Sequence, residues 1–160
     1  MIGRAPVVVS LLLAAALSAR ADSFMQERKP MSTRHATGTF TVRMQPPADT
    51  GTPGTFVRLR LDKAFEGGLA GTSEVEMLAS NGGDQPAGGY VALERFNGTL
   101  DGRRGSFIMQ HSGTMSPGTM QIDVQVTPGS GTDALKDLQG RLTIRIEGKQ
   151  HFYDLAYSLP

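Results

Sequence analysis

The 160-residue sequence contains no cysteine. A chain without thiols cannot be a disulfide scaffold, a thiolate-zinc protein, a cysteine enzyme or a lipid-modified lipoprotein. The sequence also lacks a basic excess, since 16 Lys and Arg residues stand against 15 Asp and Glu residues. This balance gives no electrostatic reason to expect binding to nucleic acid or to an anionic membrane. The fold must therefore be stabilised by packing alone, and no nucleic-acid partner is predicted.

The sequence has no long hydrophobic run beyond a short one at the N-terminus. Arg4 precedes this apolar stretch, which covers residues 7–17, and Ala19-Arg20-Ala21 fits a small-x-small cleavage site. The stretch is too short to span a bilayer comfortably, which favours a cleaved signal peptide over an uncleaved membrane anchor. We therefore predict that residues 1–21 are removed. The mature chain would begin at about Asp22, be periplasmic or secreted, and have no membrane association after cleavage.

No amphipathic segment of helical length is present, whereas glycine is abundant, with 20 residues. Residues 22–35 lack periodicity and are predicted to form a flexible lead-in. Residues 36–160 have the length of a single domain with one core. Short alternating runs between glycine-containing turns are typical of an all-β protein. Eight strands are predicted, over residues 36–44, 55–65, 69–79, 89–100, 103–116, 119–127, 138–147 and 150–159.

Two dipeptide turns predict how the central strands pair. If Asp101-Gly102 closes a two-residue hairpin, Glu94 and His111 become diagonal neighbours on one face of the sheet. If Pro117-Gly118 closes the next hairpin, His111 lies opposite Val124. The strand of Val124 alternates between apolar and polar residues, so its apolar face should be the buried one. Glu94 and His111 are therefore predicted to lie inside the protein.

Two further hairpins share this interior. A three-residue loop at residues 66–68 would place Arg60 opposite Glu74 on the outer face and keep Leu59 inside. A turn at Gly148-Lys149 would close the last hairpin. Four consecutive hairpins with one consistent interior describe a meander, and its closure into a barrel removes exposed edges. An open two-sheet sandwich is the structural alternative.

Three segments carry a family resemblance: LDGRRGSF at residues 100–107, QHSGTM at 110–115 and PGSGT at 128–132. Together with the surrounding sequence, from about Ala36 to Pro160, they resemble a family of small bacterial proteins catalogued as a domain of unknown function. That family is structurally similar to allene oxide cyclase. The resemblance implies a closed eight-stranded antiparallel meander β-barrel, allene-oxide-cyclase-like or lipocalin-like. It assigns no activity, because a fold by itself does not transfer chemistry.

Glu94 and His111 are the candidate catalytic residues. A carboxylate beside an imidazole fixes its tautomer and raises its basicity, which suits proton transfer near neutral pH. Burial would raise the pKa of Glu94, and a charged His111 would lower it. The competing interpretation is a structural hydrogen-bonded pair, because buried ionisable groups are usually paired whatever their purpose.

Other inward-facing side chains are candidates for ligand binding. They combine aromatic and sulfur-containing surface with a few polar groups, and they are His151, Tyr153, Tyr157, Phe96, Phe107 and Met109. The competing interpretation is that the tyrosines fill the interior, with their hydroxyls bonded to neighbours. Lys63 has the same inward parity but lies near a strand end, so its side chain is expected to reach the barrel mouth.

A metal site would need His111, His151 and Glu94 to converge as two histidines and one carboxylate. No local ligand spacing supports this convergence, so no metal and no other cofactor is predicted. Residues 128–132 lack the helix and lysine of a phosphate-binding loop and predict a structured turn instead.

Val91, Leu93 and Ile108 are predicted to lie together on the outer face of adjacent strands. A solvent-facing apolar group of this kind suggests a homodimer interface.

The sequence favours an exported barrel that binds a small, mostly apolar molecule in its cavity. Two alternatives stay open. One is an isomerase-type or cyclase-type enzyme in which Glu94 and His111 form an acid–base pair, and the other is a structural or interaction barrel with a solid core. A cavity would separate the last from the others, and turnover would separate the enzyme from the binding protein.

Overall fold

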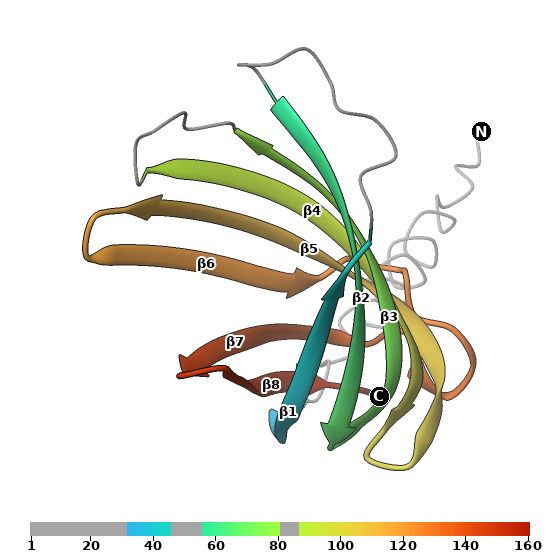
Figure 1. Cartoon of the computed structure of the whole chain (residues 1–160). Helices are drawn as coiled ribbons and strands as arrows, with labels where there is room; N and C mark the ends of the chain where they lie inside the picture. The colour runs from blue at the N-terminus through green and yellow to red at the C-terminus, as the bar shows by residue number, and fades with distance from the viewer. Residues whose placement is uncertain (1–31, 46–55, 81–86) are drawn as a thin grey trace, which may run out of the picture. The chain divides into compact units, whose positions relative to one another are not determined.

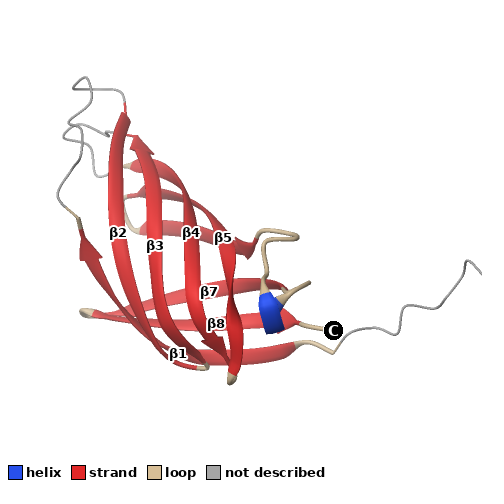
Figure 2. Ribbon diagram, turned by 90° about the vertical axis from the view of Figure 1, so that its right-hand side faces the viewer, coloured by secondary structure: helices blue, strands red, loops and turns tan. Residues whose placement is uncertain are grey.

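The computed structural model describes residues 32–45, 56–80 and 87–160. Eight antiparallel strands follow one another in chain order around a closed barrel, and the last pairs with the first (Figures 1 and 2). The strands are β1 (Arg34–Met44), β2 (Phe56–Gly67), β3 (Leu69–Ser80), β4 (Gly88–Leu100), β5 (Arg103–Ser116), β6 (Thr119–Val126), β7 (Gln139–Glu147) and β8 (Gln150–Ser158). The predicted all-β meander barrel is confirmed, and the sandwich alternative is wrong.

The structure describes the chain from residue 32 onward, so it does not describe most of the N-terminal segments predicted from the sequence. The predicted signal peptide, residues 1–21, lies outside the described residues, as does the predicted lead-in up to Met31. β1 begins at Arg34, two residues before its predicted start. Within the described ranges, no helix is long and apolar enough to cross a membrane.

The predicted registers are confirmed in the central and last hairpins. Glu94 and His111 are diagonal neighbours on the inner face of β4 and β5, and both are buried. His111 lies opposite Val124 of β6. In the last hairpin, Ile144 lies opposite Tyr153 as the Gly148-Lys149 turn requires. Turn chemistry and strand alternation therefore fix these pairs without reference to the rest of the barrel.

The register between β2 and β3 differs from the prediction by two residues. Arg60 lies opposite Glu76 instead of Glu74, and every other pair of this hairpin is displaced in the same way. The reason is that residues 66–70 leave the β2–β3 ladder, and their two halves pair with β1 and β4 instead. A shift by an even number of residues keeps each side chain on its predicted face. Leu59 therefore still faces inward.

One end of the barrel, termed the closed end, contains the β4–β5 turn and is packed solid. The 3₁₀ turn η2 (Asp133–Leu135) packs against β5 at this end (Figure 2). Phe96 lies between Phe65 and Phe107, with ring centroids 5.6 Å and 5.1 Å apart. The core at this end also contains four fully buried leucines, namely Leu69, Leu100, Leu135 and Leu138. This interdigitated core can stabilise the fold without any disulfide.

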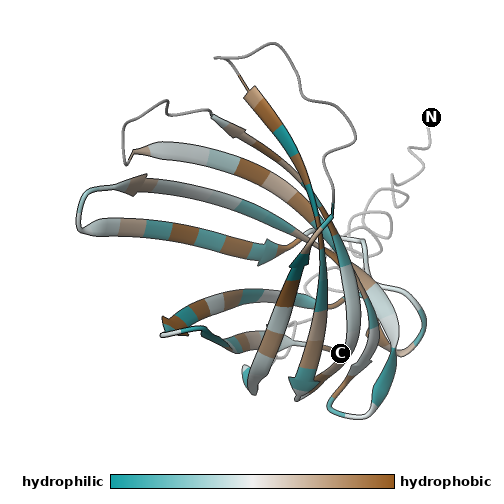
Figure 3. Ribbon diagram, viewed as in Figure 1, coloured by the Kyte–Doolittle hydropathy of each residue, from teal (hydrophilic) through white to brown (hydrophobic). Residues whose placement is uncertain are grey.

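The opposite end, termed the open end, contains the β5–β6 and β7–β8 turns. β6 and β7 share one backbone pair, Gln125 with Arg141, and diverge beyond it (Figure 1). Hydrophobic and hydrophilic residues alternate along both strands (Figure 3). Inward-facing apolar side chains at this end remain exposed: Val42 39%, Met44 61%, Met115 46%, Met120 52% and Ile146 44%. The inward-facing side chains are therefore buried in the closed half and exposed in the open half.

Candidate functional site

Four polar side chains meet on the inner wall, between the closed core and the open end. Lys63 Nζ lies 2.6 Å from Glu94 Oε2, and His111 Nε2 lies 2.8 Å from the same oxygen. The hydroxyl of Ser73 donates a hydrogen bond to Glu94 Oε1. The Glu94 side chain is fully buried, and those of Lys63 and His111 are only 10% and 5% exposed. One carboxylate is thus in contact with an ammonium, a hydroxyl and an imidazole in an otherwise apolar wall.

Strand pairing explains why these side chains converge. Lys63 of β2 lies opposite Ser73 of β3, and Val75, two residues further along β3, lies opposite Glu94 of β4. His111 follows on β5 as the diagonal neighbour of Glu94. Side chains two residues apart on a strand share a face, so all four point into the barrel.

The expectation that Lys63 extends to the barrel mouth is wrong. Its ammonium turns inward, contacts Glu94 and lies 5.0 Å from the centroid of the Phe40 ring. An ammonium loses hydration when it is buried, but a carboxylate and an aromatic face at short range both compensate for that loss. Lys63 is therefore a member of the cluster and not part of the rim.

The contact between His111 and Glu94 is close but poorly aligned. Nε2 is buried and lies within hydrogen-bond distance of Oε2, yet the contact lacks the geometry of a hydrogen bond. Nε2 has no other hydrogen-bond partner among the described residues. Lys63 and Ser73 therefore hold the carboxylate, and His111 contributes by its proximity. A buried nitrogen in this situation can be satisfied by a ligand or a water molecule.

The electrostatics of the cluster keep Glu94 ionised. Burial by itself raises the pKa of the Glu94 carboxyl, but the adjacent His111 and the ammonium of Lys63 outweigh burial and lower the pKa from 4.5 to about 2. A fully buried carboxylate with so low a pKa is a weak proton acceptor near neutral pH. This geometry suits Glu94 to balancing the charge of the wall better than to transferring a proton.

The predicted ligand-binding residues lie at different levels of the barrel. Phe96, Phe107 and Met109 belong to the closed core, where each is at most 1% exposed. His151 is half-buried and stacks on Phe40, with ring centroids 5.0 Å apart. Phe40 also contacts Lys63 and so links His151 to the polar cluster. Met109 and Phe96 adjoin the cluster from the closed core, because they lie opposite Glu94 and Ser73.

Tyr153 and Tyr157 tie strands together at the closed side of the cluster. The Tyr153 hydroxyl accepts a hydrogen bond of 2.7 Å from the backbone N–H of Leu69. The Tyr157 hydroxyl donates a hydrogen bond of 2.7 Å to Asp101 in the β4–β5 turn. Burial raises the pKa of both tyrosines. Their hydroxyls are thus neutral and already engaged with the protein.

The site residues that sequence reasoning missed are Lys63 and Ser73. Both have inward parity, which is visible in the sequence, but the predicted β2–β3 register does not place them opposite each other, whereas the observed register does. Within the described ranges, no group of three or more His, Asp or Glu side chains is arranged to hold a metal ion.

Residues 36–157 match the family described as "Protein of unknown function (DUF3224)". The chain belongs to the DUF3224 family. The match begins within β1 and ends within β8, so it includes part or all of every strand and all four cluster residues. The predicted resemblance to a bacterial family of unknown function is therefore confirmed.

A solved DUF3224 structure supports the same conclusion. The crystal structure of a protein with unknown function from Shewanella oneidensis MR-1, a DUF3224 member, is 37% identical to this chain with a TM-score of 0.72. The alignment covers 81% of this chain and 98% of the Shewanella chain. No curated protein matches the sequence.

Proposed function

We propose that this DUF3224 protein binds a small, mostly apolar molecule with an anionic end at the open end of the barrel. The observation that carries the proposal is the inward-facing apolar surface left exposed there. Five of the nine exposed large hydrophobic side chains among the described residues lie on this surface. Covering such a surface with an apolar ligand is favourable, and barrel mouths are frequent ligand sites. The polar cluster lies directly below it.

The charges of the inner wall support an anionic end for the ligand. In the open half of the described barrel, the inward-facing ionisable groups are Lys63, His111, His151 and the phenol of Tyr90 against one carboxylic acid, Glu94. Glu94 is already neutralised by Lys63. The wall therefore offers donors without a free carboxylate, and a ligand carboxylate would accept hydrogen bonds from them.

The geometry favours binding over the two alternatives. An isomerase or cyclase would need Glu94 or His111 to exchange a proton with a substrate, but Glu94 is fully buried, ionised and held by Ser73 and Lys63. The alternative of a barrel with a solid core fits only the closed half. If residues 1–21 act as a cleaved signal peptide, as we propose from their sequence, the ligand is met in the periplasm or outside the cell.

Nile red, a neutral apolar dye, should bind the purified protein and be displaced by decanoate but not by decylamine. Met120→Glu puts a carboxylate among the exposed inward-facing side chains and should weaken both dye and decanoate binding by roughly tenfold or more. Gln121→Glu is the matched control, because Gln121 is the next residue on the same strand and points outward. Fluorescence titration measures the affinities of the natural protein and of both variants for the dye and for decanoate.

Two results of that titration would contradict the proposal. Unchanged dye binding by the Met120→Glu variant would show that the open end is not the binding site. Equal displacement by decylamine and decanoate would leave an apolar site but contradict its preference for an anion.

A further inference from the structure

Four large hydrophobic side chains are exposed on the outer face of β2, β3 and β4, away from the proposed ligand site. Their exposed fractions are 57% for Phe56, 45% for Leu78, 58% for Val91 and 55% for Leu93. Leu78 and Val91 are cross-strand partners, which makes the group continuous. These four residues are termed the outer patch. Contiguous exposed apolar surface of this kind marks a protein interaction site.

Ile108, which the sequence groups with Val91 and Leu93, is not part of the outer patch. It is half-buried, and its backbone is covered by Ser130, whose hydroxyl accepts a 3.0 Å hydrogen bond from the Ile108 N–H. The loop at residues 128–132 therefore packs on β5 and limits the patch on that side.

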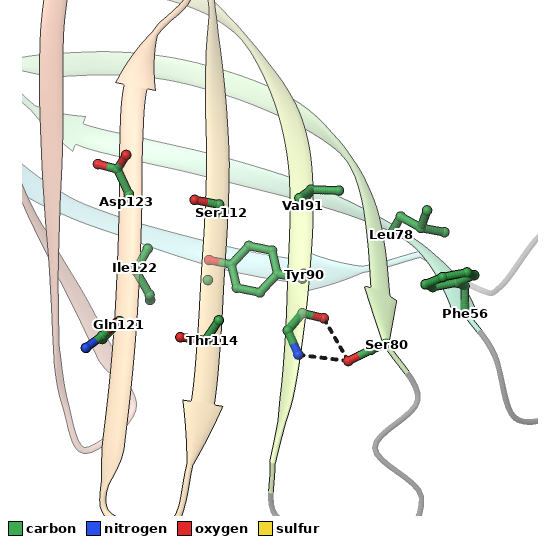
Figure 4. A pocket seen from close by; sticks show the side chains of 12 residues that line it. Phe56, Leu78, Ser80, Tyr90, Val91, Ser112, Thr114, Gln121, Ile122 and Asp123 are labelled. Atoms are coloured by element: carbon green, nitrogen blue, oxygen red, sulfur yellow. Dashed lines mark hydrogen bonds between the residues drawn. The ribbon is translucent and has the colours of Figure 1, made fainter.

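The surface around the outer patch is hollowed. One hollow of about 580 Å³ extends from Phe56 on β2 to Asp123 on β6 (Figure 4). A second hollow of about 460 Å³ includes Leu93 and shares Leu78 and Val91 with the first. A concave apolar face can receive protruding side chains of a protein partner, and such fit at the centre is what stable interfaces require.

Charge along this face identifies the partner. Successive register pairs define one row across five strands, from Arg58 through Leu78, Val91 and Ser112 to Asp123. Figure 4 shows the last four of these side chains along the hollow. The row has a positive charge at one end and a negative charge at the other, with Leu78, Val91 and the small polar Ser112 between them. If a second copy of this surface faces the first with its row running in the opposite direction, opposite charges meet at both ends of the row.

We propose that a second copy of this chain docks on the outer patch to form a two-fold symmetric dimer. A two-fold axis in the interface, parallel to β4 and passing by Val91, reverses the row in the second copy. Val91 then meets Val91, and Arg58 of each copy meets Asp123 of the other. Arg58 already contacts Glu76 and Asp123 already contacts Arg141, so each new ion pair joins two existing ones on the rim. The apolar centre and charged rim match the anatomy of protein interfaces.

Sedimentation velocity on the purified full chain tests the location of the interface. The unmodified protein should sediment as a dimer, and Val91→Glu should convert it to a monomer. Met120→Glu, on the inner face, should leave the dimer intact. A monomer at every accessible concentration, or a dimer that survives Val91→Glu, would overturn the proposal, and neither result bears on ligand binding at the open end.

Charge reversal tests the orientation of the two copies. Arg58→Glu and Asp123→Arg should each weaken dimerisation by roughly tenfold or more, because like charges then face each other at both rim contacts. An equimolar mixture of the two variants should associate as a heterodimer, since both contacts again pair opposite charges. Arg60→Glu is the control, because Arg60 also contacts Glu76 but lies outside the row. A mixture that associates no more tightly than either variant alone would refute this geometry.

Discussion

Lys63→Met should destabilise the protein by about 3–5 kcal/mol. Methionine keeps an unbranched apolar side chain in the wall but removes the ammonium that lies 2.6 Å from Glu94. A fully buried carboxylate would then lack its positive partner, and no other lysine or arginine of the described residues contacts it. Chemical denaturation at neutral pH measures the loss of the free energy of unfolding.

Two further variants show whether charge pairing causes this effect. Adding Glu94→Gln to Lys63→Met removes both charges and should recover much of the stability, because the amide oxygen can still accept the hydrogen bond from Ser73. Arg60→Ala, on the exposed face of the same strand, should cost less than about 1 kcal/mol. A double variant no more stable than Lys63→Met would contradict the role of charge pairing in the cluster.

Acid should destabilise the natural protein more steeply than the Glu94→Gln variant. The pKa of Glu94 is about 2 in the folded protein and has its ordinary value of 4.5 when the chain unfolds. The stability that ionised Glu94 contributes is therefore fully present above pH 4.5 and is lost as the pH falls towards 2. The difference between these pKa values corresponds to roughly 3 kcal/mol.

Denaturation curves between pH 5 and pH 2 measure this contribution as the difference in slope between the two proteins. Glu74→Gln provides the control, because Glu74 is exposed on the outer face of β3 and should leave the slope nearly unchanged. Parallel slopes for the natural protein and Glu94→Gln would show that Glu94 is not held in its ionised form by its neighbours.

The sequence predicts the barrel because turns and alternation are local properties. Asp101-Gly102 and Gly148-Lys149 specify two-residue hairpins, and each hairpin fixes the face of its side chains. The diagonal placement of Glu94 and His111 follows from the first of these turns, and the structure confirms it. Local chemistry thus suffices for both residues of this pair.

The cluster as a whole cannot be predicted in the same way, because it depends on a register that the local sequence does not fix. A loop at residues 66–68 predicts pairs two residues away from those formed, since β1 and β4 compete for the ends of β2 and β3. In the predicted register Lys63 does not face Ser73, so the sequence does not reveal the contact between Lys63 and Glu94. The sequence shows which face each side chain is on, but it does not show how residues of distant strands pair.

The exposure of the open end also cannot be predicted from the pattern of the sequence. Alternation along β6 and β7 correctly puts Ile122 and Ile144 inside, but it carries no information on the separation of two strands. That separation follows from the single pair between Gln125 and Arg141, with the chain between the strands packed against β5 through Ser130 and Thr132. Strand parity therefore predicts an apolar interior without predicting which part of it remains exposed.

The methionines permit the most direct test of ligand binding at the open end. Met44, Met115 and Met120 line the open end, whereas Met109 is 1% exposed in the closed core. In NMR spectra of protein labelled with ¹³C at the methionine methyl groups, addition of decanoate should shift the signals of the three open-end methionines and leave that of Met109 in place. Saturating decanoate without a shift at any of the three, or with a shift at Met109 alone, would contradict the proposal that the open end of the barrel is the ligand site.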